Sequence, residues 1–307
     1  MRLAITGALG HIGSALIRDP RLIETFDEIV IIDNLSTQRF PSLFALPSGT
    51  KYTFLQGDVT EHLTPELVSQ SAAVIHLAAS TDASASVLNP DDVFANNLRI
   101  TEHAVDISHR TGTPLVFVST TSVYTSPQEV VDENCTDLAP ASPYAQCKLQ
   151  EERQVLDRLG AGLSVVFRLG TIFGTSPGMR FHTAVNKFCW QAACGQPVEV
   201  WSTAMDQLRP YLAIDDAVDT LSRAVRKSIY PGQVVNAVTC DASVREVLQA
   251  IESYGTQVKF RIIDSPIMNK LSFRTSVNRA VGLGFGFSGD LPASVRETLQ
   301  LLGNLAR

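Results

Sequence analysis

The chain has 307 residues and a formal net charge of −6, with 45% hydrophobic and 18% charged residues. This length predicts one large domain or two interleaved ones, and the composition excludes intrinsic disorder. The acidic balance, without a long Lys/Arg cluster, argues against nucleic acid or a membrane as the main partner. No apolar stretch is long enough to cross a bilayer, and the five cysteines show no zinc-site spacing. We therefore expect a cytoplasmic protein with reduced thiols and no metal site.

Short apolar segments alternate with helical patterns through the first half of the chain. Strands are predicted at 3–6, 28–33, 52–56, 74–77, 115–119 and 165–168, with helices at 11–18, 91–110 and 143–159. Residues 29–32 read Ile-Val-Ile-Ile, a continuous apolar run that is typical of a strand buried on both faces. This alternation predicts an α/β protein with a doubly wound parallel sheet.

The second half of the chain is less regular. Apolar residues at helical spacing predict helices near 181–192 and 217–225, and Ser243 with Glu246 forms a predicted capping box. A last helix is predicted from about residue 291, with Gly303 as its stop. Helices with scattered strands indicate a smaller, mixed C-terminal lobe.

A glycine-rich segment follows the first predicted strand and opens the first predicted helix. Gly7, Gly10 and Gly13 have the spacing G-x-x-G-x-x-G, and Asp33 ends the second strand about 20 residues later. Such glycines let backbone N–H groups approach a pyrophosphate, and the acidic residue binds adenosine ribose hydroxyls. Because a carboxylate repels a 2′-phosphate, the pattern favours NAD over NADP. Arg39 could meet such a phosphate, but we interpret it as a solvated loop charge.

Tyr144 and Lys148 form the pattern Y-x-x-x-K, directly after Ser142-Pro143, a pair that suits the start of a helix. Both side chains would then lie on one helix face. A nearby ammonium lowers the pKa of a phenol from about 10, which makes tyrosine a usable general base. Hydroxyl side chains at 119–122 end the strand at 115–119, and ligands of parallel sheets bind at the carboxyl ends of strands.

Together these motifs resemble the extended short-chain dehydrogenase/reductase superfamily, in its NAD-dependent nucleotide-sugar epimerase/dehydratase branch. The motifs are T-G-x-x-G-x-x-G at 6–13, Asp33-Asn34-Leu35, Gly57-Asp58-Val59, His76-Leu77-Ala78-Ala79 and S-P-Y-x-x-x-K at 142–148. The resemblance covers essentially the whole chain and is strongest over 1–175. It implies a Rossmann-type NAD-binding domain at 1–170, rejoined by about 211–240, and an interleaved, mainly substrate-binding lobe at 171–307.

The resemblance also implies roles for individual residues. Thr120, Tyr144 and Lys148 would form a catalytic triad, in which Tyr144 takes the proton of a sugar hydroxyl while its carbon gives a hydride to NAD. The implied NAD site comprises Gly7, Gly10, His11, Ile12, Gly13, Asp33, Asn34, Asp58, Val59, Leu77, Ala78, Ala79, Asn97, Tyr144 and Lys148. The family motif at Asn97 usually reads N-x-x-G-T, and Ile100 replaces its glycine here.

The implied substrate is a nucleoside-diphosphate sugar. Its site comprises Thr81, Thr120, Thr121, Thr171, Arg180, His182, Asn186, Arg209 and Arg274. Arg209 resembles the arginine that pairs with the nucleotide diphosphate, an anion that suits the guanidinium fork. Two departures leave the sugar and its carrier open. Thr171 replaces a common asparagine, and Thr81-Asp82 stand where UDP-galactose epimerases tend to show basic or small residues.

The residues after Thr120 discriminate between reactions. Dehydratases of this branch carry Asp-Glu there, and decarboxylases keep a glutamate at the second position. Thr121 and Ser122 do not titrate near neutral pH, which disfavours both reactions. We therefore expect an NAD-dependent nucleotide-sugar 4-epimerase. The alternative is a nucleotide-sugar 4-dehydrogenase or ketoreductase with net hydride transfer, followed by a non-catalytic dinucleotide-sensing regulator. The resemblance also implies a homodimer, formed through the helices at 91–110 and 143–159.

Overall fold

The computed structural model describes residues 1–81, 90–140, 142–202, 204–255, 258–263 and 272–303. Its largest sheet has seven strands in the order β11-β7-β5-β4-β1-β2-β3, and all neighbours are parallel. These strands are β1 (Arg2–Thr6), β2 (Glu28–Asp33), β3 (Lys51–Gln56), β4 (Ser71–His76), β5 (Leu115–Thr120), β7 (Ser164–Leu169) and β11 (Val234–Ala237). The predicted doubly wound parallel sheet is confirmed.

The strand order reverses between β1 and β4. The chain adds β2 and β3 on one side of β1, and then β4, β5, β7 and β11 on the other. In such sheets the loops that follow the two strands at the reversal run apart and leave a crevice at the carboxyl ends. The loops after β1 and β4 therefore flank the expected ligand position.

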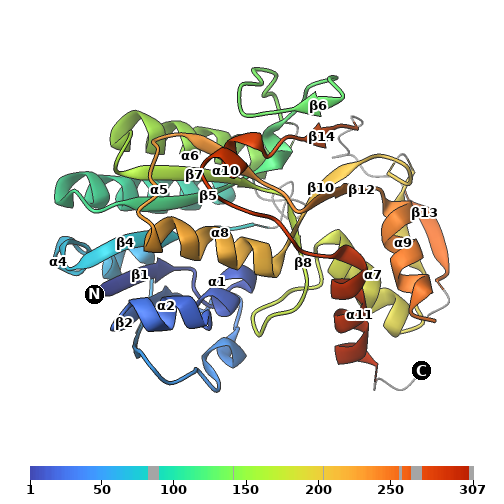
Figure 1. The fold of residues 1–307 in the computed structure, drawn as a ribbon, viewed down its shortest axis with the longest axis horizontal. Helices are drawn as coiled ribbons and strands as arrows, with labels where there is room; N and C mark the ends of the chain where they lie inside the picture. Colours follow the sequence, from blue (N-terminus) through green and yellow to red (C-terminus); the bar gives the residue numbers. More distant parts are fainter. Residues whose placement is uncertain (82–89, 141, 203, 256–257, 264–271, 304–307) are drawn as a thin grey trace.

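Helices cover both faces of this sheet (Figure 1). One layer contains α5 (Pro90–Thr111) and α6 (Pro143–Leu159), and the other contains α1 (His11–Leu16), α2 (Pro20–Thr25) and α8 (Ile214–Arg226). Successive residues of β2 enter opposite layers, because Ile29 and Ile31 join one apolar core while Val30 and Ile32 join the other. This explains the uninterrupted apolar run in the sequence.

A smaller lobe lies beside the sheet, at the right of Figure 1. In it, β10 (Arg209–Ala213) pairs parallel with β8 (Thr171–Phe173) and antiparallel with β12 (Cys240–Ala242). Three helices, α7 (Ala184–Ala193), α9 (Val244–Ser253) and α11 (Leu291–Leu302), enclose its apolar core. The predicted mixed C-terminal lobe is thereby confirmed, while the domain boundaries stay a prediction.

Short elements complete the fold: η1 (Phe40–Leu43), α3 (Val59–His62), α4 (Pro65–Ser69), η3 (Thr121–Val123), β6 (Val130–Val131), β9 (Val198–Trp201), β13 (Phe260–Ile263), β14 (Arg274–Thr275) and α10 (Asn278–Gly282).

Helix ends follow the local signals in the sequence. The Ser142 side chain caps α6, and the capping box of Ser243 and Glu246 begins α9. The first helix is shorter than predicted, because Asp19 caps a second helix, α2, whose first residue is Pro20. Similarly, α7 begins at Ala184 rather than near residue 181. Within the described residues, no helix combines the length and apolar character that a membrane span requires.

Candidate active site

The glycine-rich loop between β1 and α1 lies at the reversal of the strand order. Gly7 has a φ of +64°, and a Cβ there would lie 2.5 Å from the backbone nitrogen of Ala78. A Cβ at Gly13 would lie 2.6 Å from the Ala8 backbone. Both positions therefore require glycine. The resulting close approach joins the glycine loop to the loop that carries Leu77, Ala78 and Ala79.

The first turn of α1 suits an anionic ligand. Among the described residues, no side chain caps this helix, whereas Asp58, Thr64, Ser142, Ser243 and Asp290 cap other helices. The first N–H groups of α1, around Ile12, thus need an acceptor at the positive end of the helix dipole. A Cβ at Gly10 would approach Gly7 O to 3.2 Å and Arg39 Nη1 to 3.5 Å. The loop therefore fits a pyrophosphate that approaches its backbone closely.

Asp33 connects the glycine loop to the end of β2. Its carboxylate accepts hydrogen bonds from the backbone N–H groups of Leu9, at 3.0 Å, and Leu35, at 2.9 Å. Each carboxylate oxygen keeps a further lone pair, so a ribose hydroxyl can still donate to it. Asn34 is exposed, and its side-chain oxygen accepts from Ser36 N at 3.0 Å.

Asp58 already has several partners. It caps α3 and forms a two-point ion pair with Arg99 of α5, with N–O distances of 2.8 and 2.9 Å. Hydrogen bonds from Arg99 and Thr60 hold the pKa of Asp58 well below its usual range. An adenine contact through this carboxylate would share those oxygens. The neighbouring Val59 is buried.

The segment at 174–182, which follows β8, lies directly on the glycine loop. Gly178 N donates to Ser14 Oγ at 2.8 Å, and the ring of His11 bonds to Gly174 O at 3.1 Å. A Cβ at Gly178 would lie 2.2 Å from Leu9 O. Burial lowers the pKa of His11 to about 4, so its ring is neutral at pH 7 and donates to this carbonyl. The contacts join residues about 165 positions apart into one layer over the expected pyrophosphate.

Arg39 takes part in the same layer, and the prediction of a solvated loop charge is wrong. The side chain is partly buried, and its Nη1 donates to Gly178 O at 2.7 Å. Burial and the charge of Arg180 lower the pKa of Arg39 to about 10, while Asp33 raises it. Two guanidinium groups therefore lie near the glycine loop, where they favour an anionic ligand.

Tyr144 and Lys148 lie one turn apart on α6, which packs against β5 and η3. Lys148 is buried, with its Nζ 4.6 Å from the centre of the Phe117 ring of β5. Thr120 ends β5 at the same edge, and its hydroxyl accepts from Ser122 N at 3.1 Å. Burial raises the pKa of Tyr144 by more than Lys148 lowers it, so the expected net lowering is not found in the protein alone.

Three of the implied ligand residues hold loops of the site. The Asn97 amide exchanges two hydrogen bonds with the backbone of Ser80, at 2.8 and 3.1 Å. Asn186 does the same with Gly174, at 3.3 and 3.1 Å. Thr121 is buried, and its hydroxyl donates to Leu169 O of β7 at 3.2 Å. In this arrangement these side chains shape the site through backbone contacts.

Of the implied substrate residues, the structure brings Thr81 and Arg180 together. Arg180 donates to Thr81 Oγ1 at 2.6 Å and acts electrostatically on Tyr144, so both lie near the triad. Arg209 begins β10, where it donates to Gln207 Oε1 at 2.7 Å, and Arg274 is exposed on β14. Thr171 is partly buried on β8, and His182 is exposed. Asp82 lies outside the described residues.

Residues 3–237 match the NAD dependent epimerase/dehydratase family. The chain belongs to this family. NAD is the family's cofactor, and the uncapped start of α1 together with Asp33 fits it. The resemblance that the sequence motifs indicated is thereby confirmed.

Individual relatives differ in reaction. The chain is 29% identical over 287 residues to UDP-glucose 4-epimerase of Azospirillum brasilense, across 86% of this chain and 80% of that protein. It is also 29% identical over 230 residues to UDP-glucuronic acid decarboxylase 1 of Arabidopsis thaliana, across 72% of this chain but only 51% of the decarboxylase. The structure of the UDP-glucose 4-epimerase of Thermus thermophilus in complex with NAD superposes with a TM-score of 0.81, at 22% identity and full coverage of both chains. At that identity the similarity shows a shared fold.

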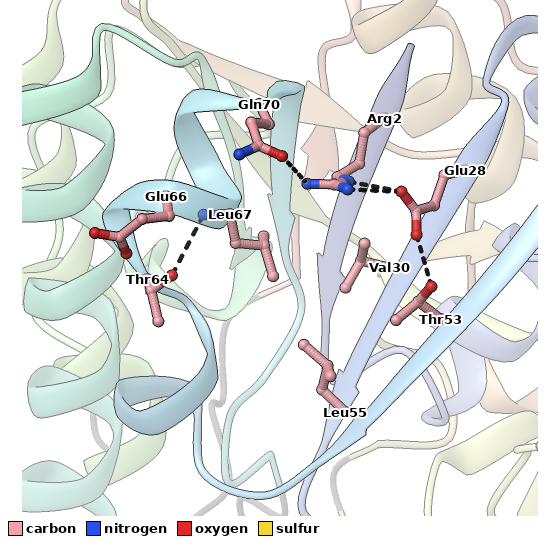
Figure 2. A pocket seen from close by; sticks show the side chains of 9 residues that line it. All are labelled: Arg2, Glu28, Val30, Thr53, Leu55, Thr64, Glu66, Leu67 and Gln70. Carbon is pink, nitrogen blue, oxygen red and sulfur yellow. Dashed lines mark hydrogen bonds and ion pairs between the residues drawn. The ribbon is translucent and has the colours of Figure 1, made fainter.

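A second groove lies at the amino ends of β1, β2 and β3, and it does not belong to the candidate active site. Figure 2 shows Arg2, Glu28 and Thr53 on the starting halves of β1, β2 and β3. Arg2 donates to Glu28 at 2.8 Å and to Gln70 at 2.9 Å, and Thr53 donates to Glu28 at 2.6 Å. Thr53, Lys51 and Arg2 lower the pKa of Glu28 to about 2. These groups satisfy one another at the amino ends of the strands, away from the carboxyl ends where ligands bind.

Proposed function

We propose that the chain is an NAD-dependent nucleotide-sugar 4-epimerase with Thr120, Tyr144 and Lys148 as its catalytic residues. The observation that carries this proposal is the end of β5, where α6 packs against β5 and η3 and the two residues after Thr120 carry hydroxyls. Elimination of water requires an acid and a base beyond the tyrosine, whereas Thr121 donates to a backbone carbonyl inside the sheet. Epimerisation requires only proton transfer at one oxygen and a hydride that leaves and returns.

The proposed roles follow from the geometry. Tyr144 accepts the proton of the C4 hydroxyl, and the Lys148 ammonium stabilises the phenolate that this transfer needs. Thr120 donates a hydrogen bond to the same oxygen as it becomes a ketone. NAD, held by the glycine loop and Asp33, would supply the hydride acceptor for the oxidation and the hydride donor for reduction of the opposite face of the ketone. Tyr144 then returns the proton.

Cofactor and substrate would bind in adjoining parts of one site, so that C4 of the sugar meets the cofactor. The glycine loop and Asp33 bind NAD, while Arg180 with Thr81 and Arg209 bind the nucleoside-diphosphate sugar. Guanidinium groups suit a diphosphate because their parallel N–H donors match its oxygens. Similarity to a UDP-glucose 4-epimerase and to a UDP-glucuronic acid decarboxylase supports a uridine diphosphate carrier.

A substrate panel tests the proposed reaction. The holoprotein is incubated with UDP-, GDP- and dTDP-sugars, and the sugar H4 signal is followed by NMR while absorbance reports NADH. The proposal predicts a 4-epimer without net NADH. Stoichiometric NADH would instead indicate a dehydrogenase, and a pentose product with release of CO2 from a uronic acid would indicate a decarboxylase.

We also propose that the protein forms a homodimer through α5 and α6, an interface that the family resemblance implies. Among the described residues, the large exposed apolar side chains lie outside these two helices. The interface would therefore be more polar than the core of an obligate dimer. Light scattering during gel filtration tests the proposal, because a monomer mass at micromolar concentration would contradict it.

A further inference from the structure

A fully buried carboxylate lies next to the proposed catalytic lysine. Glu151 is 0% exposed, and one of its oxygens lies 3.2 Å from Lys148 Nζ. Residues three and four positions apart share a helix face, so Tyr144, Lys148 and Glu151 follow one another along one side of α6. The reaction as proposed above gives Glu151 no role.

A hydrogen-bond chain leads into this carboxylate. Thr101 Oγ1 lies 2.5 Å from Glu151 Oε1, and His76 Nε2 lies 3.4 Å from Thr101 Oγ1. His76 can donate to Thr101, which then donates to Glu151. The carboxylate thus accepts from Thr101 and faces the Lys148 ammonium, the arrangement expected of an ionised glutamate.

The chain continues to the cofactor loop. Thr6 Oγ1, directly before the first glycine, lies 2.8 Å from His76 Nδ1, and Ala78 N lies 3.4 Å from Thr6 Oγ1. Every donor can point the same way, from Ala78 through Thr6 and His76 toward the carboxylate. The network therefore holds the Glu151 carboxylate in one orientation, independently of its contact with Lys148.

We propose that Glu151 is a positioning residue, which keeps Lys148 protonated in its buried place and thereby sets the pH range in which Tyr144 works as a base. This inference rests on the proposed function of Tyr144 and Lys148. A buried ammonium needs an opposite charge to remain ionised. The next carboxylate, Glu152, is engaged elsewhere, since it pairs with Arg168 at 2.7 Å and accepts from Ser119.

The charges around Lys148 support this role. Burial lowers the pKa of Lys148, but the charge and hydrogen bond of Glu151, together with the charges of Tyr144 and Cys147, more than offset this effect, so the pKa is raised overall. The Phe117 ring of β5 adds a weaker attraction.

Other groups face the cluster from each neighbouring element. Burial, together with the charges of Lys148 and His103, lowers the pKa of His76 on β4 to about 3, so His76 is neutral near pH 7. Burial raises the pKa of Cys147 on α6 to about 12, so its thiol is also neutral. The charge of Arg180 acts on Tyr144 from the segment at 174–182 and lowers its pKa. The charge of Glu151 therefore acts on Tyr144 and Lys148, the two groups whose protonation the proposed reaction uses.

The substitution Glu151→Gln removes one negative charge with little change of shape. Both Tyr144 and Lys148 should then lose their protons more easily, so both limbs of the pH profile of kcat should move toward acid by about one pH unit. Glu151→Asp keeps the charge and should restore most of the wild-type profile. The control is Asp157→Asn, which removes an exposed carboxylate from the same helix and should leave both limbs in place.

A second readout requires no turnover. Ultraviolet titration of the NAD-bound protein, with the Tyr144→Phe signal subtracted, follows the Tyr144 phenolate directly. An acid shift in Glu151→Gln supports the proposal, and an unchanged titration in a folded, NAD-loaded variant overturns it. This result is independent of the sugar, so a wrong choice of reaction would leave it intact. If Glu151→Gln does not fold, lysine carbon NMR of the wild-type protein decides, since neutral Lys148 at pH 7 would also overturn the proposal.

Discussion

At the scale of single residues, the proposed reaction depends on one hydroxyl. The substitution Tyr144→Phe removes the proton acceptor but keeps the ring and its neighbours on α6. We expect kcat to fall by about 10³-fold, within the range for loss of general acid–base catalysis. Bound NAD, measured after denaturation of the protein, should stay near the wild-type amount. If turnover of the true substrate survived the change, the assignment of Tyr144 as the base would be wrong.

The residues that the sequence reveals are those whose neighbours along the chain define them. Spacing alone places Gly7, Tyr144 and Lys148, because turns and helix faces follow from local geometry. Arg39 and Glu151 escape such reasoning, since their importance lies in burial against segments far away in the chain. The position of Glu151, three residues after Lys148, is the one signal that could have drawn attention to it.

At the scale of elements, the segment at 174–182 covers the cofactor loop. Gly178→Ala would place a methyl group 2.2 Å from Leu9 O, so this segment must move away from the loop. We expect the dissociation constant for NAD to rise by about tenfold, measured by calorimetry on cofactor-free protein. Gly286→Ala is the matched control, because a Cβ there meets nothing within 4 Å. Equal NAD affinity in both variants would contradict the proposal that the segment at 174–182 contributes to NAD binding.

The attachment of α6 to the sheet depends on a buried ion pair. Glu152 bonds to Arg168 of β7 at 2.7 Å, and both side chains are nearly inaccessible to solvent. Glu152→Ala leaves a buried, uncompensated guanidinium, so we expect the free energy of unfolding to fall by about 3 kcal/mol in urea denaturation. Glu199→Ala breaks two more exposed pairs, with Lys187 and Arg261, and should cost under about 1 kcal/mol. Similar losses in the two variants would contradict this reading.

Elements in the first half of the chain were predictable, and those in the second half less so. The strands of the large sheet are five or six residues long except for β11, and their apolar runs predict them from the sequence. In the smaller lobe, β8 and β12 have three residues each, and their common partner β10 is about 30 to 40 positions away from each. Pairing over such separations leaves little local pattern to detect.

At the scale of the whole molecule, the buried His76 and the partly buried His11 predict that mild acid lowers the stability of the protein. The pKa of His76 falls from 6.5 to about 3, chiefly through burial, and that of His11 falls to about 4. Below pH 6.5 the unfolded chain therefore binds protons that the folded chain cannot. Stability should be constant above pH 6.5 and should fall between pH 6.5 and 5, with His76 contributing up to about 1.4 kcal/mol per pH unit.

Urea unfolding of NAD-free protein at pH 7.5, 6.5 and 5.5 measures this effect, above the range in which carboxylates titrate. The variant His76→Asn removes the titrating ring and should show a shallower pH dependence, even if it is less stable at pH 7.5. Parallel curves for the two proteins would refute the assignment to His76.

The net charge of −6 bears on which ligands the whole molecule attracts. Both proposed ligands are diphosphates, yet the chain as a whole is acidic. Arg39 and Arg180 lie near the glycine loop, where their mutual repulsion contributes to the lowered pKa of Arg39. A local cationic site on an acidic surface favours binding of an anion without attraction to polyanions such as nucleic acid.

In the proposed reaction, a hydride leaves C4 of the sugar and returns to the same carbon. The direct test uses a nucleotide sugar that carries deuterium at C4, incubated with the holoprotein in ordinary water. We predict that NMR and mass spectrometry will show the 4-epimer with its deuterium retained at C4 and no accumulation of reduced cofactor. Loss of the label to NAD with a ketone as final product, or exchange of the label with solvent, would contradict the proposed epimerisation.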